Sequence, residues 1–179
     1  MLRIAAFAVA IATAVALLAF AVAKAQITDD PVLLAQLEQL FPDAASFSAK
    51  SGNPPHFKAY AAAASGQDPE LLGLAYWTTE LEPLERAYDG PVKMLVGMDA
   101  AGVLTGIIVT DHREPYGYFS VDTPEFAQQF VGKSIRDRFQ VGADVDAITR
   151  ATITVTSASR AIRNSSRRIA RAYLVPPQQ

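Results

Sequence analysis

Positions 146–154 read Asp-Ala-Ile-Thr-Arg-Ala-Thr-Ile-Thr and bring several hydroxyl groups next to one arginine. The hydroxyl of Thr152 can become one ester arm of a phosphodiester, a group that keeps about one negative charge and several acceptor oxygens. Backbone amides at the start of an arginine-rich helix could hold that anion, and Asp146 and Thr149 can hydrogen-bond the strand-to-helix turn before it. The same composition also suits an ordinary β-strand, because threonine and isoleucine are common in strands.

This segment resembles the sequence D-x-x-(S/T)-G-A-T-x-(T/S) of FMN-binding domains. In that family a dedicated flavin transferase esterifies FMN to the threonine that corresponds to Thr152. The resemblance therefore implies a covalent phosphoester between FMN and Thr152. It also implies that the other motif positions help to bind the cofactor, namely Asp146, Thr149, Arg150, Ala151 and Thr154.

Arg150 departs from the family sequence, which usually has glycine at this position. If the position needs a positive φ angle, an arginine is unfavourable there, because a side chain at Cβ crowds the left-handed backbone. Alternatively, the guanidinium could pair with the phosphodiester. The residue types alone leave both interpretations open.

A second segment, His112-Arg-Glu-Pro-Tyr-Gly117, resembles the H-x-E-P sequence that precedes the flavin site in the same domains. The resemblance runs from about residue 40 to about residue 173. It is strongest to the periplasmic flavin domain of NosR/NirI-type regulators, and weaker to the flavin subunits of Rnf and Na+-pumping quinone reductase complexes. It implies that His112 and Glu114 lie near the isoalloxazine ring, although both could simply close a strand before a proline. Tyr116 could stack on the flavin or pack in the domain.

Composition excludes several other functions. The chain has no cysteine and two histidines, which excludes thiolate metal sites and argues against a protein-only zinc site. A formal net charge of -2 does not suggest a nucleic-acid-binding protein. Phosphate-binding and dinucleotide-binding glycine motifs and the hydrolase serine elbow do not occur.

The first 25 residues have the pattern of a secretory signal peptide. Arg3 precedes an apolar run from residue 4 to residue 22, and Ala23-Lys24-Ala25 offers a small-x-small cleavage site. An uncleaved anchor is the alternative, because the run is long enough to span a bilayer. Either interpretation predicts a periplasmic or otherwise extracytoplasmic location for residues 26–179, which we expect to form one FMN-binding domain.

Hydrophobic periodicity predicts an α+β fold with an antiparallel-rich sheet and flanking helices. Asp30-Pro31 should begin a helix that ends at Pro42, and Thr123 should cap a helix over 123–130. The end of the chain should form a helix with a solvated arginine face. The remaining expectations are strands at 56–63, 71–79, 92–98 and 103–110, the last two forming a hairpin, an exposed charged segment at 80–89 and turns at 46–55.

Taken with the resemblance, these features predict an electron carrier, not a self-contained enzyme. It would relay electrons between a membrane-bound redox donor and a periplasmic acceptor, with nitrogen-oxide respiration as one setting that the resemblance implies. A flavin transferase would be its third partner. Two alternatives remain: a sensing or interaction module of the same fold without flavin, and a small secreted flavin reductase, which the lack of a nicotinamide-binding fingerprint disfavours.

Overall fold

The computed structural model describes residues 30–64 and 66–174. The predicted signal peptide at residues 1–25 lies outside these ranges. Within them, no helix combines the length and apolar composition needed to cross a membrane. The elements are α2 (Pro31–Leu40), β1 (Ser46–Phe47), β2 (Phe57–Tyr60), β3 (Leu71–Trp77), α3 (Thr78–Leu81), β4 (Lys93–Asp99), β5 (Leu104–Asp111), the short 3-10 helix η1 (Gly117–Phe119), α4 (Pro124–Gln128) and α5 (Thr152–Tyr173).

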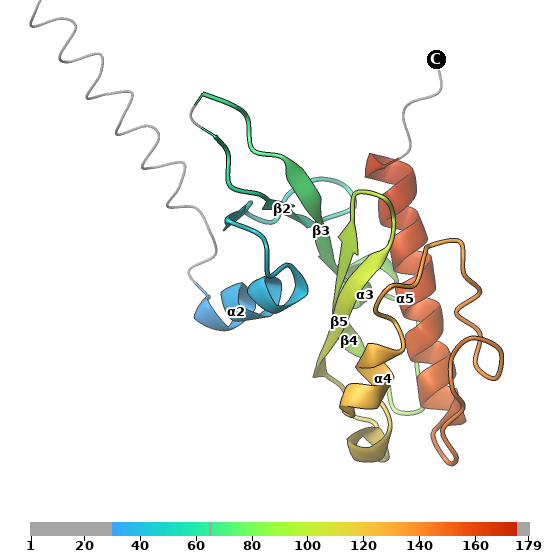
Figure 1. The fold of residues 1–179 in the computed structure, drawn as a ribbon. Helices are drawn as coiled ribbons and strands as arrows, with labels where there is room; N and C mark the ends of the chain where they lie inside the picture. Colours follow the sequence, from blue (N-terminus) through green and yellow to red (C-terminus); the bar gives the residue numbers. More distant parts are fainter. Residues whose placement is uncertain (1–29, 65, 175–179) are drawn as a thin grey trace, which may run out of the picture.

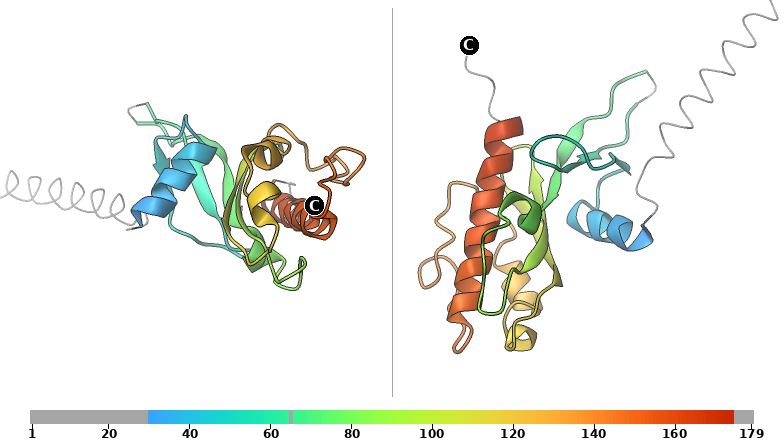
Figure 2. Two further views of the ribbon diagram at one scale, coloured as in Figure 1. Left: turned by 90° about the horizontal axis from the view of Figure 1, so that it is seen from below. Right: turned by 180° about the vertical axis from the view of Figure 1, so that it is seen from behind.

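The strands form one five-stranded antiparallel sheet in the order β1-β2-β3-β4-β5. Helix α2 covers one face of the sheet, and the long helix α5 lies on the other face with α3 and α4 (Figures 1 and 2). The predicted α+β class and the predicted hairpin, now β4 and β5, are confirmed. The structure adds β1 in a stretch where the sequence predicted only turns.

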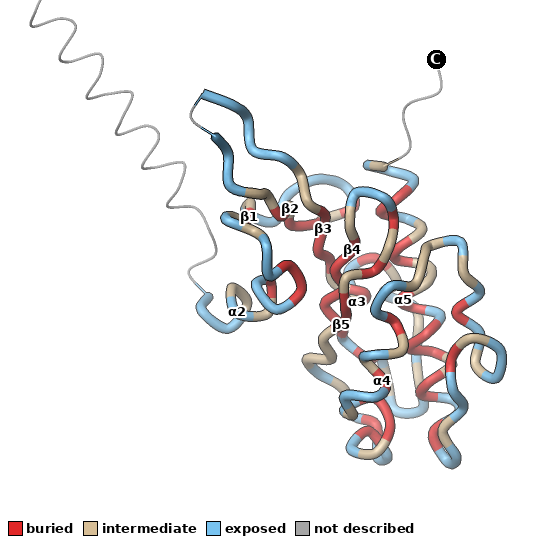
Figure 3. Tube along the Cα trace, viewed as in Figure 1, coloured by how far each residue is buried: buried red, intermediate tan, exposed pale blue. Residues whose placement is uncertain are grey.

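Alternation along β4 divides the core into two layers. Met94, Val96 and Met98 face α5, whereas Leu95 faces α2. Buried positions accordingly follow the central strands and the inner side of α5 (Figure 3). Because side chains of a strand point alternately to opposite faces, a strand buried on both faces reads as a continuous apolar run.

The end of α2 rests on a part of the sheet that lacks side chains. A Cβ added to Gly97 would lie 3.1 Å from Cβ of Leu40, and one added to Gly106 would lie 3.1 Å from Cδ2 of the same leucine. The start of α2 is capped as predicted, since Oδ1 of Asp30 accepts a hydrogen bond from the amide of Val32 at 2.9 Å. The helix ends at Leu40, with Phe41 as its C-cap.

Two expectations about polar segments hold only in part. Residues 80–89 are not uniformly exposed: α3 begins at Thr78, inside the predicted strand, and buries Leu81. The arginine face of α5 is also not simply solvated. Arg167 donates through Nη2 to the carbonyl of Asp137 at 2.7 Å, and Arg168 donates through Nη1 to the carbonyl of Leu81 at 2.7 Å. These two arginines therefore attach loops to the helix.

His56 closes the end of the molecule where α5 finishes. Its ring is buried, lies 4.2 Å from the ring of Tyr173, and contacts the carbonyl of Pro54 through Nδ1 at 3.0 Å. Among the described residues, Nε2 has no hydrogen-bond partner. A protonated ring would therefore have a second N–H without an acceptor among the described residues, which disfavours the charged form.

This arrangement predicts a loss of stability in mild acid. Burial lowers the pKa of His56 below its usual value of 6.5; the hydrogen bond to Pro54 opposes this shift, and the charge of Lys58 adds to it. The unfolded chain therefore binds the proton more readily, and the stability that His56 contributes is complete above about pH 6.5 and falls as the pH drops through the folded pKa. The slope is at most about 1.4 kcal/mol per pH unit. Urea unfolding between about pH 7.5 and 5 should give a flatter profile for His56→Phe than for the wild type, and equal slopes would refute the assignment.

Candidate functional site

A cavity of about 310 Å³ opens where α5 begins. Three segments that lie far apart in the sequence surround it: the loop before β4, the segment after β5 and the first turn of α5. Its volume falls in the range of about 300–1,000 Å³ that is usual for ligand pockets. The lining residues are Tyr88, Glu114, Pro115, Tyr116, Arg150, Ala151, Thr152, Ile153 and Thr154.

Thr152 is the first residue of α5 and is exposed on the cavity. Its hydroxyl donates only a long bond of 3.5 Å to the carbonyl of Ile148. The N-cap is Ala151, whose side chain cannot cap the helix, and the first turn contains no acidic residue. The first amides of this 22-residue helix are thus left to an outside acceptor, as in other anion-binding helix starts.

The other threonines of the motif differ from Thr152. Thr154 is buried, and its hydroxyl donates to the carboxylate of Glu114. Thr149 is exposed but does not line the cavity. Asp146 is also exposed and outside the cavity, where its backbone amide donates to Oε1 of Gln129 at 2.6 Å. Of the predicted motif residues, the structure therefore brings Arg150, Ala151, Thr152 and Thr154 to the cavity.

The local structure of the motif corrects two interpretations. From Thr152 onward the chain is helical, which removes the alternative of an ordinary β-strand. The turn before the helix follows a loop and not a strand, because residues 146–151 contain no assigned strand. The helix begins there because the amide of Val155 donates to the carbonyl of Ala151 at 2.9 Å.

Arg150 has a φ angle of 70°, in the left-handed region. This explains why glycine is usual at this position in the domains that the motif resembles, since only glycine adopts that backbone without crowding at Cβ. The unfavourable interpretation of Arg150 is therefore confirmed for its backbone. The residue nevertheless lines the cavity together with Thr152.

Glu114 connects the three segments around the cavity. Its side chain is 6% exposed. Its Oε1 accepts a hydrogen bond from the amide of Asp89 at 2.7 Å, and its Oε2 accepts from the amide of Tyr88 at 3.2 Å and from the hydroxyl of Thr154. With three donors already bound, the carboxylate positions the cavity wall.

His112 lies behind that wall. Its Nδ1 accepts from the amide of Glu114 at 3.0 Å, so Nε2 carries the proton and donates to Oδ1 of Asp122 at 2.8 Å. It lines a separate open cavity of about 250 Å³ with Asp122 and does not line the one at Thr152. In this structure His112 stabilises the bend of the chain that places Glu114 in the cavity wall.

Two lining residues were missed at the sequence level. Tyr88 is 70% exposed and sits in the segment that was expected to be a charged loop. Ile153 is 59% exposed, although an isoleucine in the first turn of a helix would be expected to pack inward. With Tyr116, they leave apolar surface exposed at the cavity.

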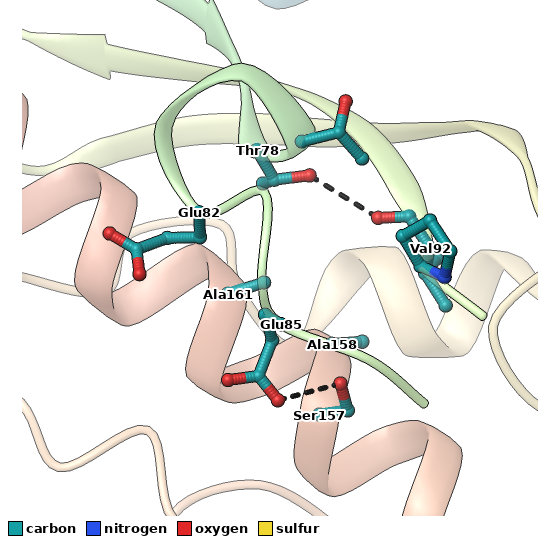
Figure 4. Close-up of a pocket in the computed structure, with 9 residues that line it drawn as sticks. Thr78, Glu82, Glu85, Val92, Ser157, Ala158 and Ala161 are labelled. Atoms are coloured by element: carbon teal, nitrogen blue, oxygen red, sulfur yellow. Dashed lines mark hydrogen bonds between the residues drawn. The ribbon is translucent and has the colours of Figure 1, made fainter. Parts of the chain in front are cut away.

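A third, much smaller cavity lies one turn further along α5. It holds only about 10 Å³, which is room for about one water molecule. Oγ of Ser157 donates to Oε1 of Glu85 at 2.9 Å across it, and the hydroxyl of Thr78 donates to the carbonyl of Val92 (Figure 4). The first bond fastens the loop before β4 to α5, and the second joins that loop to α3. The size of this cavity excludes a cofactor.

The segments around the cavity at Thr152 lie in a part of the chain that matches a known domain family. The family described as FMN-binding domain matches residues 87–166, a range that contains Tyr88, Glu114 and Thr152. A subunit of the ion-translocating oxidoreductase complex of Vibrio vulnificus (strain YJ016) is 30% identical over an alignment of 88 residues, which covers 44% of this chain and 42% of that protein. The chain thus matches less than half the length of this relative. These matches confirm the resemblance to FMN-binding domains.

Proposed function

Because residues 87–166 match the FMN-binding domain family, we propose that the protein is an electron-transfer domain that carries FMN on Thr152 through a phosphoester bond. One observation carries the choice of residue. Of the three motif threonines, only Thr152 is both exposed and part of the cavity lining. Thr149 lies outside the cavity, and Thr154 has its hydroxyl engaged by Glu114.

The residues around the cavity fit the two ends of the cofactor. The unbonded amides at the start of α5 and the guanidinium of Arg150 suit a phosphodiester. The rings of Tyr88 and Tyr116 offer apolar surface for the isoalloxazine. FMN supplies the redox chemistry when bound, and the protein sets its position and exposure.

An exposed site is suitable for exchange of electrons with other proteins. Tyr88 and Ile153 reach the solvent beside the cavity, so a partner can approach without displacing the core. We propose a membrane-bound donor and a periplasmic acceptor, with a flavin transferase attaching the cofactor. In that step the oxygen of Thr152 bonds to the flavin-side phosphorus of an activated donor such as a flavin dinucleotide, the phosphoanhydride bond breaks, the nucleoside monophosphate leaves and the hydroxyl proton is released. The location follows from the predicted leader, and the resemblance to NosR/NirI-type regulators suggests nitrogen-oxide respiration. The match to a subunit of an ion-translocating oxidoreductase supports the electron-transfer part of the proposal.

Mass analysis after co-expression with a flavin transferase tests the attachment. Trypsin should release residues 151–160, Ala-Thr-Ile-Thr-Val-Thr-Ser-Ala-Ser-Arg, as one peptide. We expect this peptide to carry one esterified FMN, with fragmentation placing it on Thr152. An unmodified peptide in the presence of an active transferase would refute the covalent assignment and favour a module without flavin. Reduction of the bound flavin by NADH alone would instead indicate a self-contained reductase.

A further inference from the structure

We propose that the guanidinium of Arg150 binds the phosphodiester of the attached flavin. It thereby offsets negative charge, which a glycine at this position cannot do. The proposal rests on the proposed function, because it needs the anion that esterification places on Thr152. It concerns a feature in which this chain departs from the domains that it resembles. Three observations carry it.

The first observation is position. Arg150 is two residues before Thr152, and both line the same cavity. It is the one cation among the lining residues. In the described part of the chain, no carboxylate forms an ion pair with it, whereas Lys133, for example, pairs with Asp144 at 3.4 Å. Its guanidinium is therefore available to a ligand.

The second observation is the charge already present on the cavity wall. Glu114 lines the cavity and is 6% exposed, so its charge is screened less by water than a surface charge would be. A phosphodiester anchored on Thr152 brings a second negative charge close to it. The partial positive charge at the start of α5 offsets part of the repulsion, and a guanidinium at position 150 offsets more.

The third observation is the backbone of Arg150. A φ angle of 70° is unfavourable for any residue with a Cβ, and glycine would remove the strain. Strained residues persist where the surrounding structure holds them, and they cluster at ligand sites. The strain alone identifies no ligand. Together with the cavity position, it marks Arg150 as a residue whose guanidinium, under the proposal, would offset this conformational cost when the site is loaded.

A thermodynamic cycle separates the charge from the strain. The folding equilibrium constant is measured by urea unfolding, with and without attached flavin, for the wild type, Arg150→Gln and Arg150→Gly. Glutamine keeps the left-handed penalty and removes the charge, whereas glycine removes both. Since the flavin stays attached in the unfolded chain, the change on loading reports how much stronger its contacts are in the folded state than in the unfolded chain.

Attached flavin should raise the folding equilibrium constant by a certain factor in each protein. This factor should be about two- to fivefold larger in the wild type than in Arg150→Gln, which is the range of an exposed ion pair. Added salt should reduce this ratio, because exposed charges are screened. Arg150→Lys should keep part of it. Without flavin, Arg150→Gly should be the most stable of these proteins, because the strain is relieved.

Arg171→Gln is the matched charge control, since Arg171 is exposed in the last turn of the same helix. Its loading effect should equal that of the wild type. Equal loading effects for the wild type and Arg150→Gln would overturn the proposal. Failure of both Arg150→Gln and Arg150→Lys to receive flavin would also overturn it, because Arg150 would then serve recognition by the transferase. A wild-type protein without flavin on Thr152 would refute the proposed function itself, and the inference with it.

Discussion

Replacing Thr152 by valine should leave the domain folded and abolish covalent attachment of flavin. Valine has nearly the shape of threonine, but it lacks the oxygen that forms the ester. The stability cost should stay within about 0.5 kcal/mol, because the lost hydroxyl is exposed and makes only one long bond, to the carbonyl of Ile148. Flavin fluorescence of the denatured protein in a gel, divided by protein amount, measures the attachment.

Two further variants make this test specific. Thr152→Ser keeps a hydroxyl at the same position and should retain a fluorescent band, although serine presents the oxygen less rigidly than a β-branched residue. Thr156→Val changes another threonine of the same tryptic peptide, and this threonine does not line the cavity. The variant should carry as much flavin as the wild type. A fluorescent band of full intensity in Thr152→Val would move the attachment to another hydroxyl and remove the basis for assigning the site to Thr152.

The elements that could be predicted from the sequence are those specified by neighbouring residues. Asp30 caps α2 and Thr123 caps α4 through hydrogen bonds to amides two or three positions away. The hairpin of β4 and β5 is likewise local, because two apolar runs flank a four-residue turn. Short-range physics of this kind is visible in a single sequence.

The cavity wall depends on pairings over long distances in the sequence, and these left no local signal. Glu114 accepts from an amide 25 positions earlier and from a hydroxyl 40 positions later. Its role as a buried acceptor could not be separated from a role beside the flavin, because both interpretations predict the same residue type. His112 illustrates the same limit: it was expected near the ring, and it supports Glu114 from behind.

The backbone of Arg150 could be predicted in part from the sequence. Glycine is usual at this position of the motif, so a positive φ angle there would make arginine unfavourable. The structure supplies the condition, a φ angle of 70°. A family pattern can therefore point to a special backbone conformation, whereas only the three-dimensional structure shows that Arg150 lines the cavity.

Replacing Glu114 by alanine should have the largest effect on stability among the substitutions around the cavity. The change leaves two backbone amides and the hydroxyl of Thr154 without their acceptor, in a place where Glu114 is 6% exposed. A buried donor that loses a charged partner costs about 1–3 kcal/mol, and water entering the space left by the side chain will satisfy part of the loss. We therefore expect the free energy of unfolding to fall by about 3 kcal/mol in urea titrations at neutral pH.

The matched control is Glu125→Ala, which removes an exposed carboxylate from the first turn of α4 and should cost at most about 0.5 kcal/mol. Glu114→Gln should fall between the two, because an amide oxygen still accepts but carries no charge, and the amide group adds donors that lack a partner. Thr154→Val removes one donor and leaves the carboxylate to the two amides, so it should cost less than Glu114→Ala. If Glu114→Ala were no more harmful than Glu125→Ala, the three hydrogen bonds could not be a main link between Tyr88 and α5, beside the bond between Glu85 and Ser157. Contacts other than those of Glu114 would then have to determine the shape of the cavity at Thr152.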